Sequence, residues 1–543
     1  MGFSRRILRL IRPSHEHSEL SATVLLMAAV MLSRVIGYFR EAYIAYAFGA
    51  GHATDAYVAA FTLPDWLNYL VAGGTASITF IAIYTRFLAE KREDEAQKTF
   101  SIIISVMTVV LGIGVVLAEI FAEPIERRLF PHFDPGQLQL CVHLTRILLP
   151  GQVFFYVGGV VSAVLLSRRL FLLPAFGPLL YNVFIILGGV VLGNRIGIAS
   201  LAYGALFGAF VGPFLVNAIG ARRVGTGYRP SFDLSNTAFR EWVKLSIPLM
   251  LGVSLVTADD WILRYFASGG AGDITRLNYA KRLFLVPIAV LGQATGQASL
   301  PFFARLFNEK RLQEFRQTVN NSIYRITAVS FLSTAWMMAA ALPLIDLVYR
   351  RGRFHFSDSR ETALYFFWFA ISLAFWSAQA LYARAFYAAG DTLTPMIACS
   401  IITLASLPMY AALFRAFSVV GLTIASDIGI VANTAALALL LHRRQLVPSS
   451  TLPWRELGKA GFTSLFALAV SYGVARSIPL NGSRGADALS LFLVSITWAA
   501  AVAIGLWATR SELPGALRRR GQRTTYPHVA EKHAEDMSAG LEP

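Results

Sequence analysis

About seven basic residues lie inside stretches of the chain that are otherwise apolar, and four of them lie well within such a stretch or at matching points of the two halves. Arg34 and Arg40 lie in the first such stretch, and Lys281 and Arg282 lie at the equivalent point of the second half. In a helix, six residues place Arg34 and Arg40 about 9 Å apart along the axis, so both can line one cavity at successive depths. An arginine side chain binds phosphate oxygens with two parallel N–H groups. These cations predict a site for an anionic ligand.

The acidic residues beside them have more than one possible role. Arg40 can pair with Glu41 or with Asp55, in which case the arginine is structural and binds no ligand. Asp55 begins another apolar stretch after a Gly-Ala-Gly segment, so capping of its own helix is its simplest role. Thr54 can equally provide that cap.

A second acidic pair and the absence of enzyme motifs limit the chemistry that this chain can perform. Asp259 and Asp260 lie toward the outer end of an apolar stretch, where they can hold a cation or a proton or can be solvated at an interface. The chain has no Gly-rich phosphate loop, no HExxH and no nucleophile elbow. Cys141 and Cys399 stand apart, and neither lies in a CxxC or His-rich motif. We therefore expect a protein without catalytic residues, bound metal or cofactor.

The composition identifies the elements that must position these residues. Of 543 residues, 55% are hydrophobic and only 15% are charged, against about 25% charged in soluble proteins. Uncharged stretches of about 20 residues, the length that crosses a bilayer, recur along the chain. This excludes a cytosolic enzyme, a disordered protein and a secreted disulfide-rich protein. The net charge of +16 resides in short loops without interleaved aromatic residues, so nucleic-acid binding is not expected.

The apolar stretches predict an all-α, multi-pass membrane protein with fourteen spans. An even number of spans and the excess of Lys and Arg in alternate loops place both termini in the cytoplasm. Arg350, Arg351, Arg353 and Arg360 are exceptions, because they fall on the outer side. The predicted spans are 22–48, 56–85, 99–122, 142–167, 174–193, 197–221, 241–265, 278–304, 318–348, 361–389, 394–414, 418–442, 458–478 and 487–509.

The two halves of the chain have related patterns. Tyr57 and Pro64 in the second span are repeated by Tyr279 and Pro287 in the eighth, at nearly the same offset. The arginine-containing loop that precedes Pro174 is repeated before Pro395 at a similar offset. We infer a duplication of six spans, followed by two additional spans, although chance matching of Pro and Tyr is the alternative. Six crossings return the chain to the same side, so both halves have the same topology.

Longer motifs resemble a known family. The segments Leu32–Glu41, Phe48–Gly51 and Thr54–Tyr57 are similar to the opening of the MurJ (MviN) family of lipid II flippases. Tyr279–Leu283 resembles the eighth span of that family, and Arg384–Ala389 with Asp391, Thr392, Thr394 and Pro395 resembles its loop after span ten. Tyr349–Phe354 resembles an outside loop of the family, which would account for the charged exceptions to the topology rule.

The resemblance implies a fold and a set of functional residues. The fold is that of the multidrug/oligosaccharidyl-lipid/polysaccharide exporters, with two six-helix lobes in a V that opens alternately to each side. The implied substrate is an undecaprenyl-pyrophosphate-linked muropeptide, lipid II, carried from the inner to the outer leaflet of the bacterial plasma membrane. Arg34, Arg40 and Arg282 would hold the pyrophosphate, while Glu41, Asp55 and Lys281 would support them or act in gating. Membrane lipids, and possible cell-wall synthesis proteins, are the other partners expected.

The predicted domains follow this scheme. They are a cytoplasmic segment (1–21), an N-lobe (22–221), a linker (222–240), a C-lobe (241–442), two spans that form a groove for the lipid tail (443–510) and a cytoplasmic tail (511–543).

The chain departs from the family in its second span. Leu67-Asn68-Tyr69 stands where the family usually has Leu-Arg-Arg, and Ala72–Thr75 lacks the usual glutamate. Lys281 replaces the usual aspartate before the arginine of span eight. Two alternatives therefore remain open: a transporter of another substrate on the same fold, such as a cationic-drug exporter or a carrier of another polyprenyl-linked glycan, and a membrane scaffold that transports nothing.

Overall fold

The computed structural model describes residues 19–69, 75–168, 170–250, 255–478 and 483–518. The described residues form helices joined by turns, and no strand occurs among them. The predicted all-α class is therefore confirmed. The predicted terminal segments 1–21 and 511–543 fall largely outside the described residues, as does most of the Ala72–Thr75 segment.

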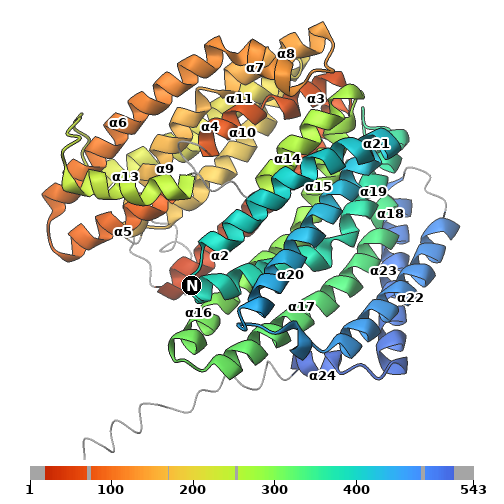
Figure 1. Cartoon of the computed structure of the whole chain (residues 1–543). Coiled ribbons are helices and arrows are strands. Elements are labelled where there is room, and N and C mark those ends of the chain that lie inside the picture. Colours follow the sequence, from red (N-terminus) through yellow and green to blue (C-terminus); the bar gives the residue numbers. More distant parts are fainter. Residues whose placement is uncertain (1–18, 70–74, 169, 251–254, 479–482, 519–543) are drawn as a thin grey trace, which may run out of the picture. The chain divides into compact units, whose positions relative to one another are not determined.

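The first part of the chain, up to residue 223, supplies twelve of the helices in the described residues (Figure 1). These are α2 (Glu19–Phe48), α3 (His52–Ala59), α4 (Thr62–Leu67), α5 (Thr75–Ala89), α6 (Glu93–Ile120), α7 (Ala122–Leu129), α8 (Pro135–Leu148), α9 (Gly151–Ser167), α10 (Leu172–Ile196), α11 (Ala199–Ala209), η2 (Phe210–Val216) and α12 (Asn217–Arg223).

The remaining described helices follow from residue 237 onward. These are α13 (Thr237–Met250), α14 (Leu255–Phe266), η3 (Ala267–Gly269), α15 (Asp273–Pro287), η4 (Ile288–Ala294), α16 (Thr295–Asn308), α17 (Leu312–Ala339), α18 (Ala341–Tyr349), α19 (Phe356–Ile371), α20 (Leu373–Ala388), α21 (Leu393–Arg443), η5 (Ser449–Thr451), α22 (Trp454–Ser477), α23 (Arg484–Ala508) and α24 (Leu513–Arg518).

Local sequence signals explain where several helices begin and break. The carboxylate of Asp134 accepts the Gln137 N–H at 2.9 Å before α8, whose first residue is proline. The hydroxyl of Ser483 accepts the Ala486 N–H at 3.2 Å at the start of α23. Within α21, Ser418 has a φ of 53° and a ψ of −139°, which lies outside the helical region. Ser418 therefore divides α21 near the boundary predicted between the spans 394–414 and 418–442.

The membrane spans agree with this division. Eight helices of the described residues are long and apolar enough to cross a bilayer, or ten if each of two bent helix pairs is one span. One of them, α21, contains two predicted spans on either side of Ser418. The three predicted spans not among these, 22–48, 56–85 and 241–265, contain residues whose structure or side chains lie outside the described set.

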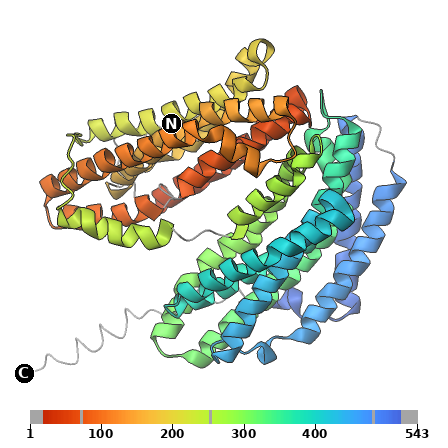
Figure 2. The same ribbon diagram turned by 45° about the horizontal axis from the view of Figure 1, so that its top comes forward.

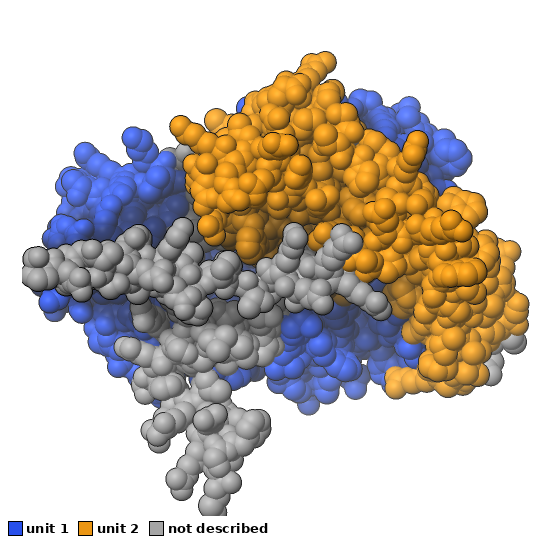
Figure 3. All heavy atoms as spheres, turned by 90° about the horizontal axis from the view of Figure 1, so that it is seen from below, with its two compact units in different colours: residues 1–283, 344–369, 396–429 blue, residues 284–343, 370–395, 430–543 orange. Residues whose placement is uncertain are grey.

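The chain divides into two compact units, which Figure 3 shows in different colours. Unit 1 comprises Met1–Leu283, Leu344–Phe369 and Met396–Gly429, and unit 2 comprises Phe284–Pro343, Ala370–Pro395 and Ile430–Pro543. These boundaries come from contacts within the chain and do not test the predicted lobes at 22–221 and 241–442, which stay a prediction.

Small residues allow helices to pack closely within unit 1. Helices α10 and α11 lie side by side, and a methyl group on Gly204 would lie 2.5 Å from the Phe184 carbonyl oxygen. Gly188 meets the Ser200 carbonyl oxygen in the same way. Because lipid supplies no hydrophobic driving force between helices, such close backbone approach is a main source of packing energy in membranes. The apolar centre of the unit contains Phe80, Phe100 and Trp242.

Unit 2 contains a compact packing of α17 against the last helices. Helices α22 and α23 run side by side, as Figures 1 and 2 show in blue. The indole N–H of Trp498 donates to the Leu332 carbonyl at 2.9 Å, and that of Trp336 donates to the Ser495 hydroxyl at 2.9 Å. These indole groups tie α23 to α17, because a polar group inside a bilayer must find its hydrogen-bond partner within the protein.

Candidate functional site

Glu41 joins two arginines that are far apart in the sequence. Arg40 lies next to Glu41 on α2 and donates to its carboxylate, and Arg282 on α15 approaches the same carboxylate oxygen with its Nε at 3.1 Å. The Glu41 side chain is only 6% exposed, whereas that of Arg282 is 44% exposed. Two guanidinium groups thus share one carboxylate, which leaves a net positive charge with an accessible donor. Such a group can bind an anion without first losing its own support.

Asn182 fixes the second side of the Arg40 guanidinium. Arg40 Nη1 donates to Asn182 Oδ1 at 2.8 Å, and Asn182 Nδ2 donates to the Pro178 carbonyl at 3.0 Å. Asn182 thus bonds back to the carbonyl four residues earlier on its own helix. Asn182 is buried, and it was not among the residues predicted for the site. An amide inside an apolar helix is the signal that could have found it.

Arg34 lies on the same helix but outside these contacts. Its side chain is exposed and makes no ion pair with any described residue. Tyr38 lies between Arg34 and the Glu41 group, and its hydroxyl donates to the Arg282 carbonyl at 3.4 Å. Of the three arginines predicted to bind substrate, Arg40 and Arg282 therefore come together at Glu41. Arg34 lies about two helical turns before Glu41 on α2 and remains exposed.

Lys281 faces a different set of partners from its neighbour Arg282. Its ammonium group is buried and pairs with Asp259 and, at 2.6 Å, with Asp260 on α14. Asp259 also accepts hydrogen bonds from Tyr410 and, at 3.0 Å, from Ser426, which lie on opposite sides of the break in α21. The two aspartates therefore hold a cation, but that cation is the side chain of Lys281. Neither Tyr410 nor Ser426 was singled out from the sequence.

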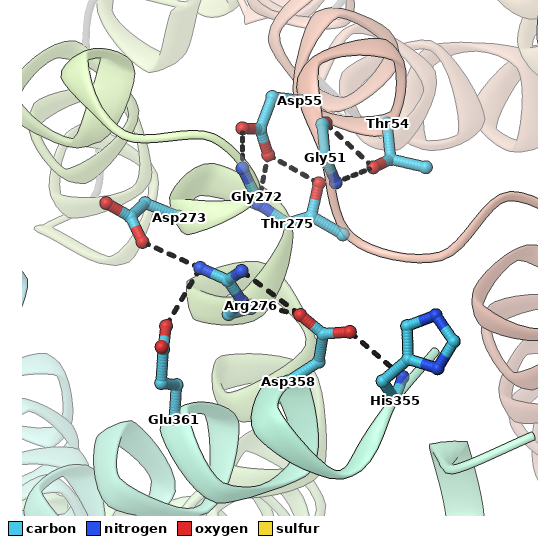
Figure 4. Close-up of polar contacts among 10 residues, drawn as sticks. All are labelled: Gly51, Thr54, Asp55, Gly272, Asp273, Thr275, Arg276, His355, Asp358 and Glu361. Carbon is cyan, nitrogen blue, oxygen red and sulfur yellow. Dashed lines mark hydrogen bonds and ion pairs between the residues drawn. The ribbon is translucent and has the colours of Figure 1, made fainter. Parts of the chain in front are cut away.

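Asp55 caps a helix other than its own (Figure 4). Its carboxylate accepts from the backbone N–H groups of Gly272 at 2.6 Å and Thr275 at 2.8 Å, and from the Thr275 hydroxyl at 2.6 Å, at the N-terminus of α15. The cap of α3 instead involves Thr54, whose hydroxyl accepts the Gly51 N–H at 2.8 Å. Self-capping by Asp55, the simplest expectation, is thus replaced by a contact over more than 200 residues. Asp55 contacts none of the three arginines.

An ion-pair network lies beside this contact (Figure 4). Arg276 on α15 pairs with Asp273 at 3.0 Å, Asp358 at 3.0 Å and Glu361 at 2.9 Å. The other carboxylate oxygen of Asp358 accepts the His355 backbone N–H at 2.9 Å and so begins α19. Arg276 therefore fastens α15 to α19 within unit 1.

The backbone of residues 352–353 also meets the end of α2. The Arg353 N–H donates to the Tyr46 carbonyl at 3.0 Å. Gly352 has a φ of 57°, and a methyl group there would lie 2.2 Å from the Tyr46 oxygen, so no other residue fits without movement. The segments around Tyr46, Asp55, Gly272 and Gly352 thus converge. We name this convergence, with the Arg276 network, the latch.

A buried carboxylate lies in the same unit on the short helix α7. Glu126 is fully buried and accepts the Thr145 hydroxyl at 2.9 Å and the Cys141 thiol at 3.9 Å. It makes no ion pair with a described residue. Burial raises the pKa of Glu126 from 4.5 to about 7, and the hydrogen bond from Thr145 opposes this only in part. No motif in the sequence singles out Glu126.

The described residues contain no group of three or more His, Cys, Asp or Glu side chains with the geometry of a metal site. The site residues described above offer electrostatic chemistry: exposed guanidinium groups that can bind an anion, and an internal ammonium group already held by carboxylates. Arg34, Arg40 and Glu41 lie on α2, Asp259 and Asp260 lie on α14, and Lys281 and Arg282 lie on α15.

The chain matches a known protein family over most of its length. The family model described as lipid II flippase MurJ matches residues 44–483. A lipid II flippase MurJ of Burkholderia cenocepacia is 28% identical over 432 residues, which cover 77% of this chain and 83% of the relative. A probable lipid II flippase MurJ of Synechocystis is 26% identical over 478 residues, covering 84% and 88% of the two chains.

Solved structures show the same fold. A lipid II flippase MurJ in an inward closed conformation aligns with a TM-score of 0.75 at 21% identity, over 89% of this chain and 99% of that one. An inward-facing multidrug resistance MATE family transporter of the MOP superfamily aligns with a TM-score of 0.61 at 15% identity, over 78% and 98%. From the extent of the family match, the chain belongs to the lipid II flippase MurJ family.

Proposed function

We propose that this protein is a flippase that moves lipid II, a polyprenyl-pyrophosphate-linked peptidoglycan precursor, from the inner to the outer leaflet by alternating access. It is a transporter and not an enzyme. The observation that carries the proposal, together with family membership, is that Glu41 gathers Arg40 and Arg282 from two distant helices. A pyrophosphate group needs several N–H donors at once, and this cluster offers them beside a buried counter-charge.

The residues divide the work as follows in this proposal. Arg282 and Arg34 present accessible guanidinium groups to the two phosphates, and Arg40 is held in place by Glu41 and Asn182. The ion pairs of Lys281 with Asp259 and Asp260 support this site, because they hold α14 against α15 next to Arg282. Any ion that couples to transport at Asp259 or Asp260 has to displace the Lys281 ammonium group.

Asp55 serves as a gate in this scheme. Alternating access requires contacts at one end of the transport path to form and break in each cycle. The latch joins residues that precede span two to residues that precede span eight and span ten, and in the predicted topology these lie on the outer side. Release of Asp55 from the N-terminus of α15 would accompany opening to that side.

The location and the remaining partners belong to the same proposal. The protein spans the bacterial plasma membrane with both termini in the cytoplasm, and its substrate carries an undecaprenyl tail. A groove along α23, lined by Trp498, Val502 and Leu506, is a suitable apolar surface for that tail. Cell-wall synthesis proteins are further partners that we expect near the outer side.

The proposal is tested in cells whose growth depends on this protein. Replacement of Arg282 or Arg34 by Ala should abolish growth at normal protein levels, whereas Arg305→Ala, at a surface position on α16, should not. Normal growth of the Arg34 and Arg282 variants would remove these residues from the mechanism.

Cargo identity separates this function from the alternatives. Native mass spectrometry of the purified protein should show a bound polyprenyl pyrophosphate lipid. A transporter of cationic drugs on the same fold, for which the MATE likeness gives a structural precedent, would show none, and neither would a scaffold. The excess of arginine around Glu41 argues against a cationic substrate.

A further inference from the structure

Three aromatic side chains cluster between α4 and α14 within unit 1. The rings of Trp66 and Trp261 have centroids 5.5 Å apart at 68°, and those of Tyr69 and Trp261 are 6.0 Å apart at 77°. Both contacts are edge-to-face, so each contact occupies the face of only one of its two rings, whereas stacking would occupy a face of both. Trp66 and Trp261 are half-buried, and Tyr69 is 40% exposed. We call this cluster the aromatic face.

Polar groups border the aromatic face and cancel in charge. Arg264, one turn after Trp261, donates to the Thr62 hydroxyl at 3.0 Å and lies 3.6 Å from Asp65 on α4. The Asp65 side chain remains 38% exposed. The indole Nε1 of Trp66 is buried but donates to no described residue. An indole N–H without a partner is unusual in a protein interior and indicates a place where an acceptor is missing.

This combination selects one class of ligand. A second phosphate would be repelled by Asp65, whose charge already balances Arg264. A hydrocarbon tail gains nothing from an ion pair and an unpartnered N–H. A sugar ring fits both features, because its C–H groups pack on the negative face of an aromatic ring and its hydroxyls exchange hydrogen bonds with carboxylate, guanidinium and indole groups.

The aromatic face is also close to the proposed phosphate site. Arg282 lies within electrostatic range of both Asp65 and Asp260, the residue before Trp261. In a lipid-linked sugar the first saccharide is bonded directly to the pyrophosphate. A ligand whose phosphates lie at Arg282 therefore presents its saccharide to the region that contains these rings.

We propose that Trp66, Tyr69 and Trp261 form a saccharide-binding subsite that recognises the disaccharide of the lipid-linked substrate, with the Trp66 N–H donating to a sugar oxygen. This inference rests on the proposed function. The subsite distinguishes sugar-bearing from sugar-free pyrophosphate lipids, while Arg282 binds both.

The test compares two lipids on the purified full-length protein in lipid nanodiscs. One is undecaprenyl pyrophosphate, and the other is undecaprenyl pyrophosphate that carries the disaccharide without its peptide; their affinities are measured by native mass spectrometry. The wild type should bind the disaccharide lipid more tightly. Trp66→Ala combined with Trp261→Ala should weaken that binding about tenfold, which corresponds to about 1.4 kcal/mol, and should change the affinity for undecaprenyl pyrophosphate less than twofold.

Milder variants keep the test decisive if the double variant does not fold. Trp66→Phe preserves a ring but removes the N–H and should weaken only the disaccharide lipid. Tyr69→Ala, at an exposed position, should do the same. Trp454→Ala, an exposed tryptophan on α22 in unit 2, is the matched control and should affect neither lipid. Arg282→Ala should weaken both.

The outcomes separate this inference from the proposed function. If the wild type binds both lipids equally, or if the aromatic variants weaken both equally, the saccharide subsite is wrong while the flippase proposal stands. If only the peptide-bearing lipid responds to the variants, the face binds peptide and the inference is again wrong. If the wild type binds no pyrophosphate lipid, the proposed function fails and the subsite fails with it.

Discussion

Buried charges at single residues show how this protein tolerates ions inside its apolar helices. Glu41 is shared between two arginines, and Lys281 is shared between two aspartates. In each case one buried group faces two of opposite sign. An unpaired charge in such a place would cost several kcal/mol of folding free energy. Each buried ion is therefore tolerated only because its partners compensate for the lost hydration.

Replacement of Lys281 by Met tests this dependence. The change leaves Asp259 and Asp260 without a cation, so we expect the free energy of unfolding to fall by about 3–5 kcal/mol, the usual cost of breaking a buried pair from one side. Thermal unfolding in detergent measures it. Adding Asp259→Asn should recover part of the loss, and Lys310→Met in an exposed turn should leave stability unchanged. Equal stability of Lys281→Met and wild type would contradict a structural ion pair.

Glu126 predicts a pH dependence of stability. Its pKa in the folded protein, about 7, exceeds the ordinary value of 4.5, so the folded state holds more protons between these two pH values. Stability should therefore fall by about 3 kcal/mol as pH rises from 4.5 to 7 and then level off. Melting temperatures at pH 5 and pH 8 measure this. Glu126→Gln should flatten that part of the profile; an unchanged slope would assign the effect to other groups.

At the scale of helices, the contact between the Asp55 carboxylate and the N-terminus of α15 is the one best suited to control movement of α15. Three hydrogen bonds converge on Asp55, and the positive end of the helix dipole adds to them. These three contacts are hydrogen bonds and not apolar packing contacts. They can therefore break and form again without repacking of the apolar side chains between helices. A latch of this kind can open without unfolding either helix.

Asp55→Ala should release the latch. Spin labels at the exposed residues His52 and His355 report on the distance across it, by double electron–electron resonance. We expect the population at long distance to rise about tenfold or more, because hydrogen bonds to a charged group contribute about 1.5–3 kcal/mol each. Asp134→Ala, which removes the cap of α8 instead, is the control. An unaltered distance distribution would show that Asp55 does not hold the latch.

At the scale of the whole molecule, the predicted topology has to account for the arginines that it places on the outer side of the membrane. The exceptions to the positive-inside pattern are partly neutralised: Arg350 pairs with Asp346 at 2.9 Å and lies over the Phe356 ring at 4.6 Å. A paired arginine is a weaker topology signal than a solvated one. The outer placement of residues 350–360 is therefore compatible with cytoplasmic termini.

Labelling of single introduced cysteines in intact cells tests the topology. A cysteine at Arg353 should react with a membrane-impermeant maleimide from outside, and one at Lys310 should react only after permeabilisation. Each position serves as the control for the other, since both are exposed in the structure. The reverse pattern would place the termini, and with them the proposed direction of transport, on the opposite side.

Much of the architecture could be predicted because it depends on local properties. Apolar length determines where spans lie, and even the division of α21 near Ser418 was expected from the sequence. The residues of the Glu41 cluster were also predicted, since a charge inside an apolar stretch is conspicuous wherever it lies. Their pairing was not, because nothing local distinguishes the partners of Arg282 from those of Lys281.

The sequence by itself determined the class of protein, its helices and the presence of cations that require a partner, because burial in lipid penalises charge regardless of what lies nearby. Only the tertiary structure decided which carboxylate each cation meets. Lys281 and Arg282 are adjacent in sequence, yet neighbouring positions on a helix point about 100° apart, so one enters a pocket of aspartates and the other remains open at Glu41. Asp55 finds the N-terminus of α15 for the same reason: hydrogen bonds depend on distance in space, which separation along the chain does not specify.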